Sequence, residues 1–415
     1  MMQMMRAIWV GSLSLLIGCG SQAHVVPRAA SVARAEPELT PDARLLRGTT
    51  RLSQSRYADA EADLTAALNG AHKSDALLAL SELMLTTGRY PEALGLAKQA
   101  RASGGDRQAV VLAEARALRA SGENAAAMSA LRAAAAPLGA EQRLLLGELL
   151  IEAGRRAEAE PILLTLIEDY NADRIPENDA SGLCRVGRAA HLLRSPKDAN
   201  DAFDQAERAE QGNLRTLLYR AELYLDKYDP GHAEEVLTEA LQLAPQHPEA
   251  NVLLAEVRLA QALDFDEAER LARVALAQNP KLSHAYFVLA GISIRDQDLA
   301  AADRYVTEGL RGNPRDLTLL GMRAAVRFLA EDPSGFERQK AEILRLNPEY
   351  SRLYSIVGEF ADWEHRYDEI VVLMREAVAL DTKDAKAEAE LGFNLIRSGN
   401  DRDGVDALGR SFRMD

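Results

Sequence analysis

The 415-residue chain has few aromatic side chains and almost no cysteine. Phe, Trp and Tyr together make up 5% of the residues, whereas the hydrophobic class as a whole makes up 47% and is rich in Ala. Large cores usually depend on aromatic residues, so this composition favours closely packed helices instead. The two cysteines are Cys19 and Cys184. If Cys19 is consumed by another modification, no intrachain disulfide is possible and cysteine count says little about redox compartment.

The sequence also lacks the motifs that usually carry catalysis. It contains no His-Glu-x-x-His, no Gly-x-Gly-x-x-Gly, no Gly-x-x-x-x-Gly-Lys and no Gly-x-Ser-x-Gly. Its seven histidines are scattered, and none has a second histidine one helical turn away, as a two-histidine metal face requires. We therefore expect no enzymatic activity, no metal and no cofactor. The formal net charge of −14 also disfavours nucleic acid as a partner.

The N-terminus has the features of a targeting segment. Arg6 precedes an apolar run over residues 7–17, which is shorter than the roughly 20 residues that a membrane-spanning helix needs. The run ends in Leu-Ile-Gly followed by Cys19, which resembles the bacterial lipobox. The resemblance implies a signal peptide over residues 1–18, cleavage before Cys19, and a diacylglycerol on the Cys19 thiol with acylation of the new amine. The alternative is an ordinary secretory leader with a chance cysteine.

The residues that follow Cys19 bear on where the chain is held. The residue after Cys19 is Gly20 and not Asp, which by the same resemblance implies sorting to the outer membrane of a Gram-negative envelope. Residues 19–40 are rich in Ala, Pro, Arg and Val and have no helical periodicity, so we expect a flexible tether. About 20 flexible residues have a root-mean-square reach of roughly 25 Å. The folded part would then stay near the lipid surface.

The remainder of the chain repeats with a period near 34 residues. The clearest marker is a Pro just beyond a helical segment, at Pro245, Pro280, Pro314 and Pro348, with spacings of 35, 34 and 34 residues. Pro lacks an N–H and disfavours helix in the residue before it, so each marker ends a helix. A fixed period of this length indicates stacked repeats.

Small side chains recur at one position of every repeat. With starts at residues 41, 74, 108, 140, 180, 214, 248, 283, 317, 351 and 385, position 8 is always Gly, Ala or Ser, and position 20 is mostly Ala. The residues at position 8 are Gly48, Ser81, Ala115, Gly147, Gly187, Ala221, Ala255, Ala290, Ala324, Gly358 and Gly392. Small residues let two helices of one repeat approach closely, and we expect positions 8 and 20 to meet there.

This pattern resembles the tetratricopeptide repeat (TPR) family. The resemblance implies an all-α fold: a right-handed superhelical solenoid of about eleven helix-turn-helix repeats. We divide it into repeats 1–4 over residues 41–179, with an insertion near residues 170–179 that we expect to bend the solenoid, and repeats 5–11 over residues 180–415. Four apolar residues of the last repeat would lack a neighbour, so we expect the chain to be truncated at its C-terminus or to dock on a partner there. They are Leu391, Leu395, Leu408 and Phe412.

In this family the concave face of the first helices binds peptides, through positions such as 5, 9 and 12. Here position 5 and position 12 are mostly apolar, and position 9 is often Glu. Position 9 is never Asn, so a chaperone-type carboxylate clamp is not expected. The candidate groove residues are Glu82, Glu148, Leu218, Glu222, Leu225, Val252, Glu256, Leu259, Phe287, Ile294 and Phe328.

These residues predict a groove with an apolar floor and a row of carboxylates, suited to a peptide segment with apolar anchors and some Lys or Arg. The alternative is that positions 5 and 12 pack against the adjacent helix and that the glutamates only solvate the surface. As a whole, the sequence predicts a membrane-anchored scaffold that binds other proteins in the cell envelope. The second hypothesis is a binding arm of a larger enzyme, such as a metallopeptidase, whose catalytic domain is absent from this chain.

Overall fold

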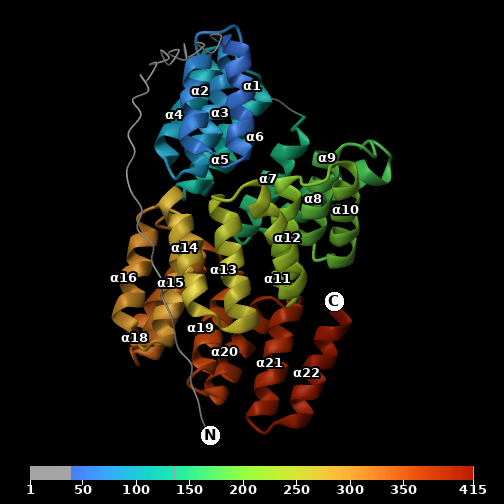
Figure 1. Cartoon of the computed structure of the whole chain (residues 1–415). Coiled ribbons are helices and arrows are strands. Elements are labelled where there is room, and N and C mark those ends of the chain that lie inside the picture. The colour runs from blue at the N-terminus through green and yellow to red at the C-terminus, as the bar shows by residue number, and fades with distance from the viewer. Residues whose placement is uncertain (1–38, 135–136, 415) are drawn as a thin grey trace, which may run out of the picture. The chain divides into compact units, whose positions relative to one another are not determined.

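The computed structural model describes residues 39–134 and 137–414, and within them the chain forms helices and turns but no strands. The predicted signal peptide, Cys19 and the tether up to residue 38 lie outside the described residues. The described part contains eleven antiparallel helix pairs, which Figure 1 shows in chain order. The first helix of each pair has an odd number and the second an even number. This confirms the prediction of an all-helical TPR-type solenoid.

The helices have the following bounds: α1 (Pro41–Ser53), α2 (Tyr57–Ala67), α3 (Lys73–Thr86), α4 (Tyr90–Ala102), α5 (Arg107–Ala120), α6 (Asn124–Arg132), α7 (Ala140–Glu152), α8 (Arg156–Asn171), α9 (Ala180–Leu192), α10 (Pro196–Ala209), α11 (Leu214–Asp226), α12 (Pro230–Leu243), α13 (Pro248–Ala262), α14 (Phe265–Gln278), α15 (Ser283–Arg295), α16 (Leu299–Leu310), α17 (Leu317–Leu329), α18 (Pro333–Leu346), α19 (Arg352–Asp362), α20 (Tyr367–Leu380), α21 (Ala385–Arg397) and α22 (Asp401–Met414). Each odd-numbered helix packs against its own partner and against the odd-numbered helix of the next pair.

Close approach at position 8 is confirmed, and its partner in these repeats is a side chain at position 24. A β-carbon added at Gly147 would lie 2.5 Å from the side chain of Leu163, and one added at Gly187 would lie 2.5 Å from that of Phe203. Leu163 and Phe203 occupy position 24, four residues after the small position 20, and both are fully buried. The small residue of the first helix therefore accommodates a large buried side chain of the second, and the two fill one shared volume.

Positions 8 and 20 also meet directly, as predicted, in two repeats. The Ser81 hydroxyl donates a hydrogen bond of 2.8 Å to the carbonyl oxygen of Ala93. In the last pair, a β-carbon at Gly404 would lie 2.8 Å from the carbonyl oxygen of Gly392. Gly404 departs from the usual Ala at position 20 because the two backbones approach too closely there for a methyl group.

The turn between the two helices of each pair contains a residue with positive φ. Gly occupies this position in four repeats, where the absence of a side chain makes the left-handed helix cap accessible without strain. The other seven repeats adopt the same backbone conformation with a side chain present, at a cost of roughly 1–2 kcal/mol per residue. These residues are Gly88, Gly122, Gly154 and Gly399, and Ser55, Arg194, Tyr228, Leu263, Gln297, Glu331 and His365.

Turns of repeats two to six contact segments between 162 and 196 residues away along the chain, and we call this set of contacts the seam. The Tyr90 hydroxyl donates to the carbonyl oxygen of Lys281 at 3.4 Å. The Asn347 amide donates to the carbonyl oxygen of Ile151 at 3.2 Å. The Tyr228 hydroxyl donates to Glu390 at 3.2 Å. The solenoid thus returns onto itself, which the repeat pattern alone did not predict.

The Asn-Pro markers take part in this seam. A β-carbon at Gly122 would collide with the side-chain oxygen of Asn313, the residue before one of the marker prolines. In the tenth repeat Asp381 replaces the Asn and forms a bidentate ion pair with Arg194. The segment that ends each of these helices therefore also contacts repeats from the previous superhelical turn of the solenoid.

The structure also describes the predicted insertion near residues 170–179 and the apolar residues of the last repeat. Near the predicted insertion, α8 continues to Asn171, α9 begins at Ala180, and the two helices pack against each other. At the other end, Leu391 and Leu395 are buried in a core cluster shared with the preceding helix pairs, so the expectation that they lack neighbours was wrong. Phe412 is exposed as expected, with 86% of its surface accessible.

Candidate functional site

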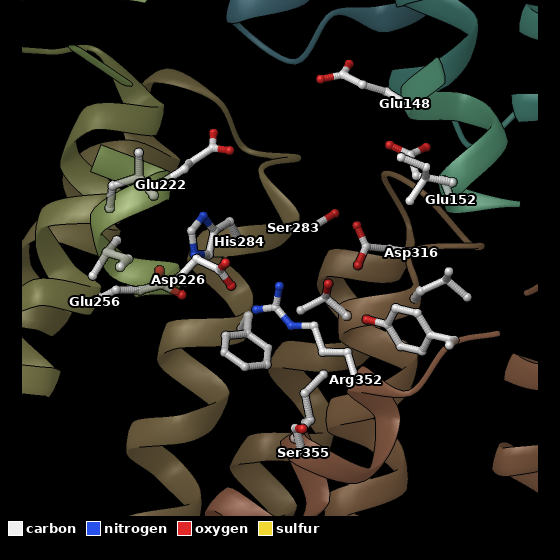
Figure 2. A pocket seen from close by; sticks show the side chains of 18 of the residues that line it. Glu148, Glu152, Glu222, Asp226, Glu256, Ser283, His284, Asp316, Arg352 and Ser355 are labelled. Carbon is white, nitrogen blue, oxygen red and sulfur yellow. Dashed lines mark ion pairs between the residues drawn. The ribbon is translucent and has the colours of Figure 1, made fainter. Parts of the chain in front are cut away.

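The odd-numbered helices line a cavity of about 2120 Å³, which we call the lumen. Figure 2 shows Glu222, Asp226, Glu256 and Arg352 around one part of this space, projecting from α11, α13 and α19. Apolar side chains line the lumen beside these charged groups. They include Leu218, Leu225, Leu259 and Phe287.

The structure brings most of the predicted groove residues into the lumen. Three of the eleven candidates do not line it. Val252 is fully buried between helices, and Ile294 is 6% exposed within the core. Phe328 packs edge-to-face on Phe336, with ring centres 5.6 Å apart. The eight that do line it are Glu82, Glu148, Leu218, Glu222, Leu225, Glu256, Leu259 and Phe287.

The glutamates at position 9 alternate with arginines in repeats two to six, and we call these five residues the ion-pair ladder. Arg188 donates to Glu148 at 3.0 Å and to Glu222 at 2.7 Å. Arg116 lies 3.5 Å from Glu82. In this half of the lumen each position-9 carboxylate has a cation of the same chain beside it.

The surroundings of the ladder show why these charges are tolerated. Glu148 is only 7% exposed, and burial alone would raise its pKa, but Arg119 and Arg188 outweigh burial and lower the pKa of Glu148. Glu141, two turns earlier on α7, is paired with Arg185 at 3.1 Å and Arg215 at 2.9 Å. Burial opposes ionisation there too, and the arginines again hold the pKa of Glu141 below its usual value.

The alternation stops in repeats seven to eleven. There position 9 is Glu256, Gly291, Ala325, Glu359 and Phe393. Glu256 pairs with the His284 ring at 2.7 Å, and that contact lowers the pKa of Glu256 against the effect of burial. Within the described residues, Glu359 forms neither an ion pair nor a hydrogen bond. The two position-9 neighbours of Glu359 are uncharged.

The carboxyl group of Glu359 therefore has a raised pKa. Its side chain is accessible to water in the lumen, but protein surrounds it. Removal from bulk water raises the pKa of Glu359 to about 7; Lys386 and Arg352 act in the opposite direction, and the Glu256 and Glu390 carboxylates add to the increase. Desolvation also raises the pKa of Glu390, which lies on α21.

The net charge of the lumen is close to zero. Its lining residues include as many Asp and Glu side chains as Lys and Arg side chains. The chain as a whole has a formal net charge of −14, so the negative excess lies elsewhere than on the lumen wall. The glutamates of position 9 therefore do not make the lumen acidic, and local unpaired charges determine what it can select.

The sequence reasoning missed the arginines of the lumen. Arg116 and Arg188 occupy position 9 of repeats three and five, in the same register as the glutamates that were predicted. Reading all residues at that position, and not the glutamates alone, would have shown the alternation. The residues of the seam had no comparable signal in the sequence, because a repeat pattern does not specify how many repeats make up one superhelical turn.

Two properties of the described chain limit the kinds of site present. No three His, Cys, Asp or Glu side chains in residues 39–134 and 137–414 are arranged to hold a metal ion. No helix in the same ranges is both long enough and apolar enough to cross a membrane. Cys184 is 1% exposed, and burial raises the pKa of its thiol, so it is a packed core residue.

The fold and the lumen define a TPR-type helical-repeat protein. No protein-family model matches the chain, and no curated protein is similar to it in sequence. Three solved structures with a similar arrangement of helices are yeast Tom70 (14% identity, TM-score 0.43, 90% of this chain and 92% of that chain covered), a human IFIT1 dimer with m7Gppp-AAAA (15%, 0.46, 88% and 95%) and a tetratricopeptide repeat protein from Parabacteroides merdae (17%, 0.41, 62% and 98%).

Proposed function

We propose that this protein is a scaffold of the bacterial cell envelope that binds segments of other proteins in its lumen and is held at a membrane by a lipid on Cys19. The observation that carries the binding role is the lumen itself. Its volume of about 2120 Å³ exceeds the roughly 300–1,000 Å³ of most small-molecule sites. A space of this size fits a peptide segment better than a small ligand.

The lining of the lumen supports a segment with apolar anchors. Leu225 and Leu259 face it from adjacent first helices, and Phe287 adds an aromatic surface. Charged side chains occupy the same wall, so a segment with both apolar and charged residues would find a counterpart for each. This is the arrangement by which an apolar anchor supplies binding energy and a charge supplies selectivity.

The anchor rests on the sequence of the N-terminus. Residues 1–18 have the composition of a lipoprotein signal peptide, and Cys19 stands at the place where the lipobox has its cysteine. A protein with two or more acyl chains stays on a membrane, whereas a single chain gives only marginal binding. We place the folded part at the periplasmic face of the outer membrane.

Site-directed photocrosslinking in the native envelope tests the lumen. A photoreactive residue at Leu225 should capture a partner, and the same residue at Val372, which is 58% exposed on α20, should not. The captured protein is then titrated against the purified chain and against Leu225→Asp, which should bind about tenfold or more weakly, since each 1.4 kcal/mol is tenfold. Equal affinity for the two chains would contradict binding in the lumen.

The anchor has a separate test. Mass spectrometry of the mature protein should find a diacylated thiol and an acylated amine at Cys19, and Cys19→Ser should release the protein from the membrane fraction. An unmodified Cys19 in the membrane fraction would contradict the anchor and leave the binding role standing.

A further inference from the structure

Glu359 occupies the same repeat position as the ladder glutamates but lacks their counter-ion. Arg116 and Arg188 provide that counter-ion in the first half of the lumen, from position 9 of neighbouring repeats. The corresponding neighbours of Glu359 are Ala325 and Phe393. A carboxylate that faces the lumen from α19 is thus left, within the described chain, without an ion pair or hydrogen bond.

The nearest cations of the chain are engaged elsewhere or remain apart. The Lys386 ammonium lies over the Tyr228 ring, 4.8 Å from its centre. Arg352 influences the charge on Glu359, but no ion pair joins them in the described residues. Within the described residues, Glu359 therefore has no cation of this chain within ion-pair distance.

Aromatic side chains are exposed on the same wall. Trp363 follows Glu359 by four residues, so the two share one side of the α19 helical stretch, and it is 41% exposed. Phe393, on the adjacent α21, is 56% exposed, and both rings line the lumen. The Trp363 ring is held edge-to-face against Phe360, with centres 5.2 Å apart. In a chain with 5% aromatic residues, two exposed rings beside an unpaired carboxylate form an uncommon combination.

We propose that Glu359, Trp363 and Phe393 form a subsite for one lysine or arginine side chain of the bound segment. The alkyl part of that side chain would lie on the rings, and its charge would pair with Glu359. Rings and a carboxylate together suit a long cationic side chain, because its stem is apolar and its head is charged. This inference rests on the proposed binding of protein segments in the lumen and specifies the chemistry of one position of that segment.

The subsite makes binding sensitive to pH. The groups that face Glu359 are Arg352 on α19, Lys386 and Glu390 on α21, and Glu256 on α13. Since the pKa of Glu359 is about 7, the carboxylate is mostly protonated in the free protein at about pH 6 and mostly ionised at about pH 8. A cationic segment binds the ionised form, so its affinity should rise about tenfold across that interval.

Selection from a displayed library of random peptides tests the proposal without a known partner. The mature full-length chain is the bait, in three forms: wild type, Glu359→Gln, and Glu269→Gln as a control, because Glu269 lies on α14 and does not line the lumen. Peptides enriched on the wild type and on Glu269→Gln should share a Lys or Arg, and those enriched on Glu359→Gln should not. In a selected peptide, Lys→norleucine should cost about tenfold in affinity for the wild type and less than about twofold for Glu359→Gln, because an ion pair contributes only where both partners are present.

The outcomes separate the two proposals. If no peptide is enriched on the wild type, binding of segments in the lumen fails, and the subsite fails with it. If peptides are enriched but show the same Lys or Arg preference on wild type and Glu359→Gln, or the same affinity at about pH 6 and pH 8, only the subsite is overturned. Trp363→Leu provides an independent variant: it keeps the carboxylate and should weaken the Lys-containing peptide more than its norleucine counterpart.

Discussion

The two halves of the lumen differ in whether the charged side chains at position 9 are paired. From α3 to α11, Glu and Arg alternate at position 9, and their ion pairs lie partly or wholly out of water. From α13 to α21 the same position holds Gly, Ala, Phe and two glutamates, of which Glu359 has no counter-ion in the described chain. The first half uses its charges to hold neighbouring repeats together. The second half leaves charge available for another molecule.

Removal of one ladder arginine should have the largest effect on stability. Arg188→Met leaves the buried Glu148 with one cation in place of two and removes the partner of Glu222. Breaking a buried ion pair is strongly destabilising, and because Glu148 keeps Arg119 we expect the lower end of the usual range, a loss of roughly 3 kcal/mol in the free energy of unfolding. Urea denaturation of the wild type and the variant measures this loss. Arg273→Met, which breaks an exposed pair with Glu269, is the control and should cost less than about 1 kcal/mol. Equal losses for the two variants would show that the ladder is no more than surface charge.

The seam joins the two halves, and a pair of glycines measures its contribution. Gly122 and Gly399 both have positive φ, at 79° and 84°. A β-carbon at Gly122 meets Asn313, whereas one at Gly399 has nothing within 4 Å. Substitution by Ala costs roughly 1–2 kcal/mol at either site through the left-handed backbone. Gly122→Ala should cost about 1 kcal/mol more, because the Asn313 side chain of the seam must also move away from the new methyl group. Thermal unfolding of both variants compares them, and equal shifts would mean that the seam adds no stability.

The smallest effect that we predict is the change in stability caused by Glu359→Gln, and this change depends on pH. The pKa of Glu359 in the folded chain is about 7, above its ordinary value of 4.5, so the folded state binds the proton more tightly than the unfolded state. The stability that this group contributes is fully present at pH values below its pKa in the unfolded state. It is lost as the pH rises through its pKa in the folded state. Glu359→Gln should therefore stabilise the chain at about pH 8, by no more than about 1 kcal/mol because water in the lumen screens the charge.

The pH series provides the control for this prediction. Below about pH 4 the wild type and Glu359→Gln should have equal stability, since the carboxylate is protonated in both the folded and the unfolded state. A difference that does not change between the two pH values would exclude titration of Glu359 as its cause.

The sequence predicted the helical pairs because their cause is local. The small residue at position 8, the Gly after four of the first helices and the four marker prolines after second helices all act within one repeat, so a period of 34 is visible in the chain. Contacts such as Tyr90 with Lys281 depend on the curvature of the whole array, and small rotations per repeat add up to it. The same limit applied to the lumen: glutamates such as Glu148 were recognised, but their partners on adjacent helices were not paired with them. Val252 and Ile294 were assigned to the groove because apolar residues at one position can face a neighbour or a cavity equally well.

The seam also has a consequence for how the chain folds. Contacts within and between neighbouring helix pairs bridge a few tens of residues, and such contacts form early and fast. Lys281 is 191 residues from Tyr90 along the chain, so their contact must wait until the intervening repeats have formed and curved. We expect closure to be the last event of folding. In native-state hydrogen exchange, the backbone amides around the seam should open well before those at the centres of the helix pairs.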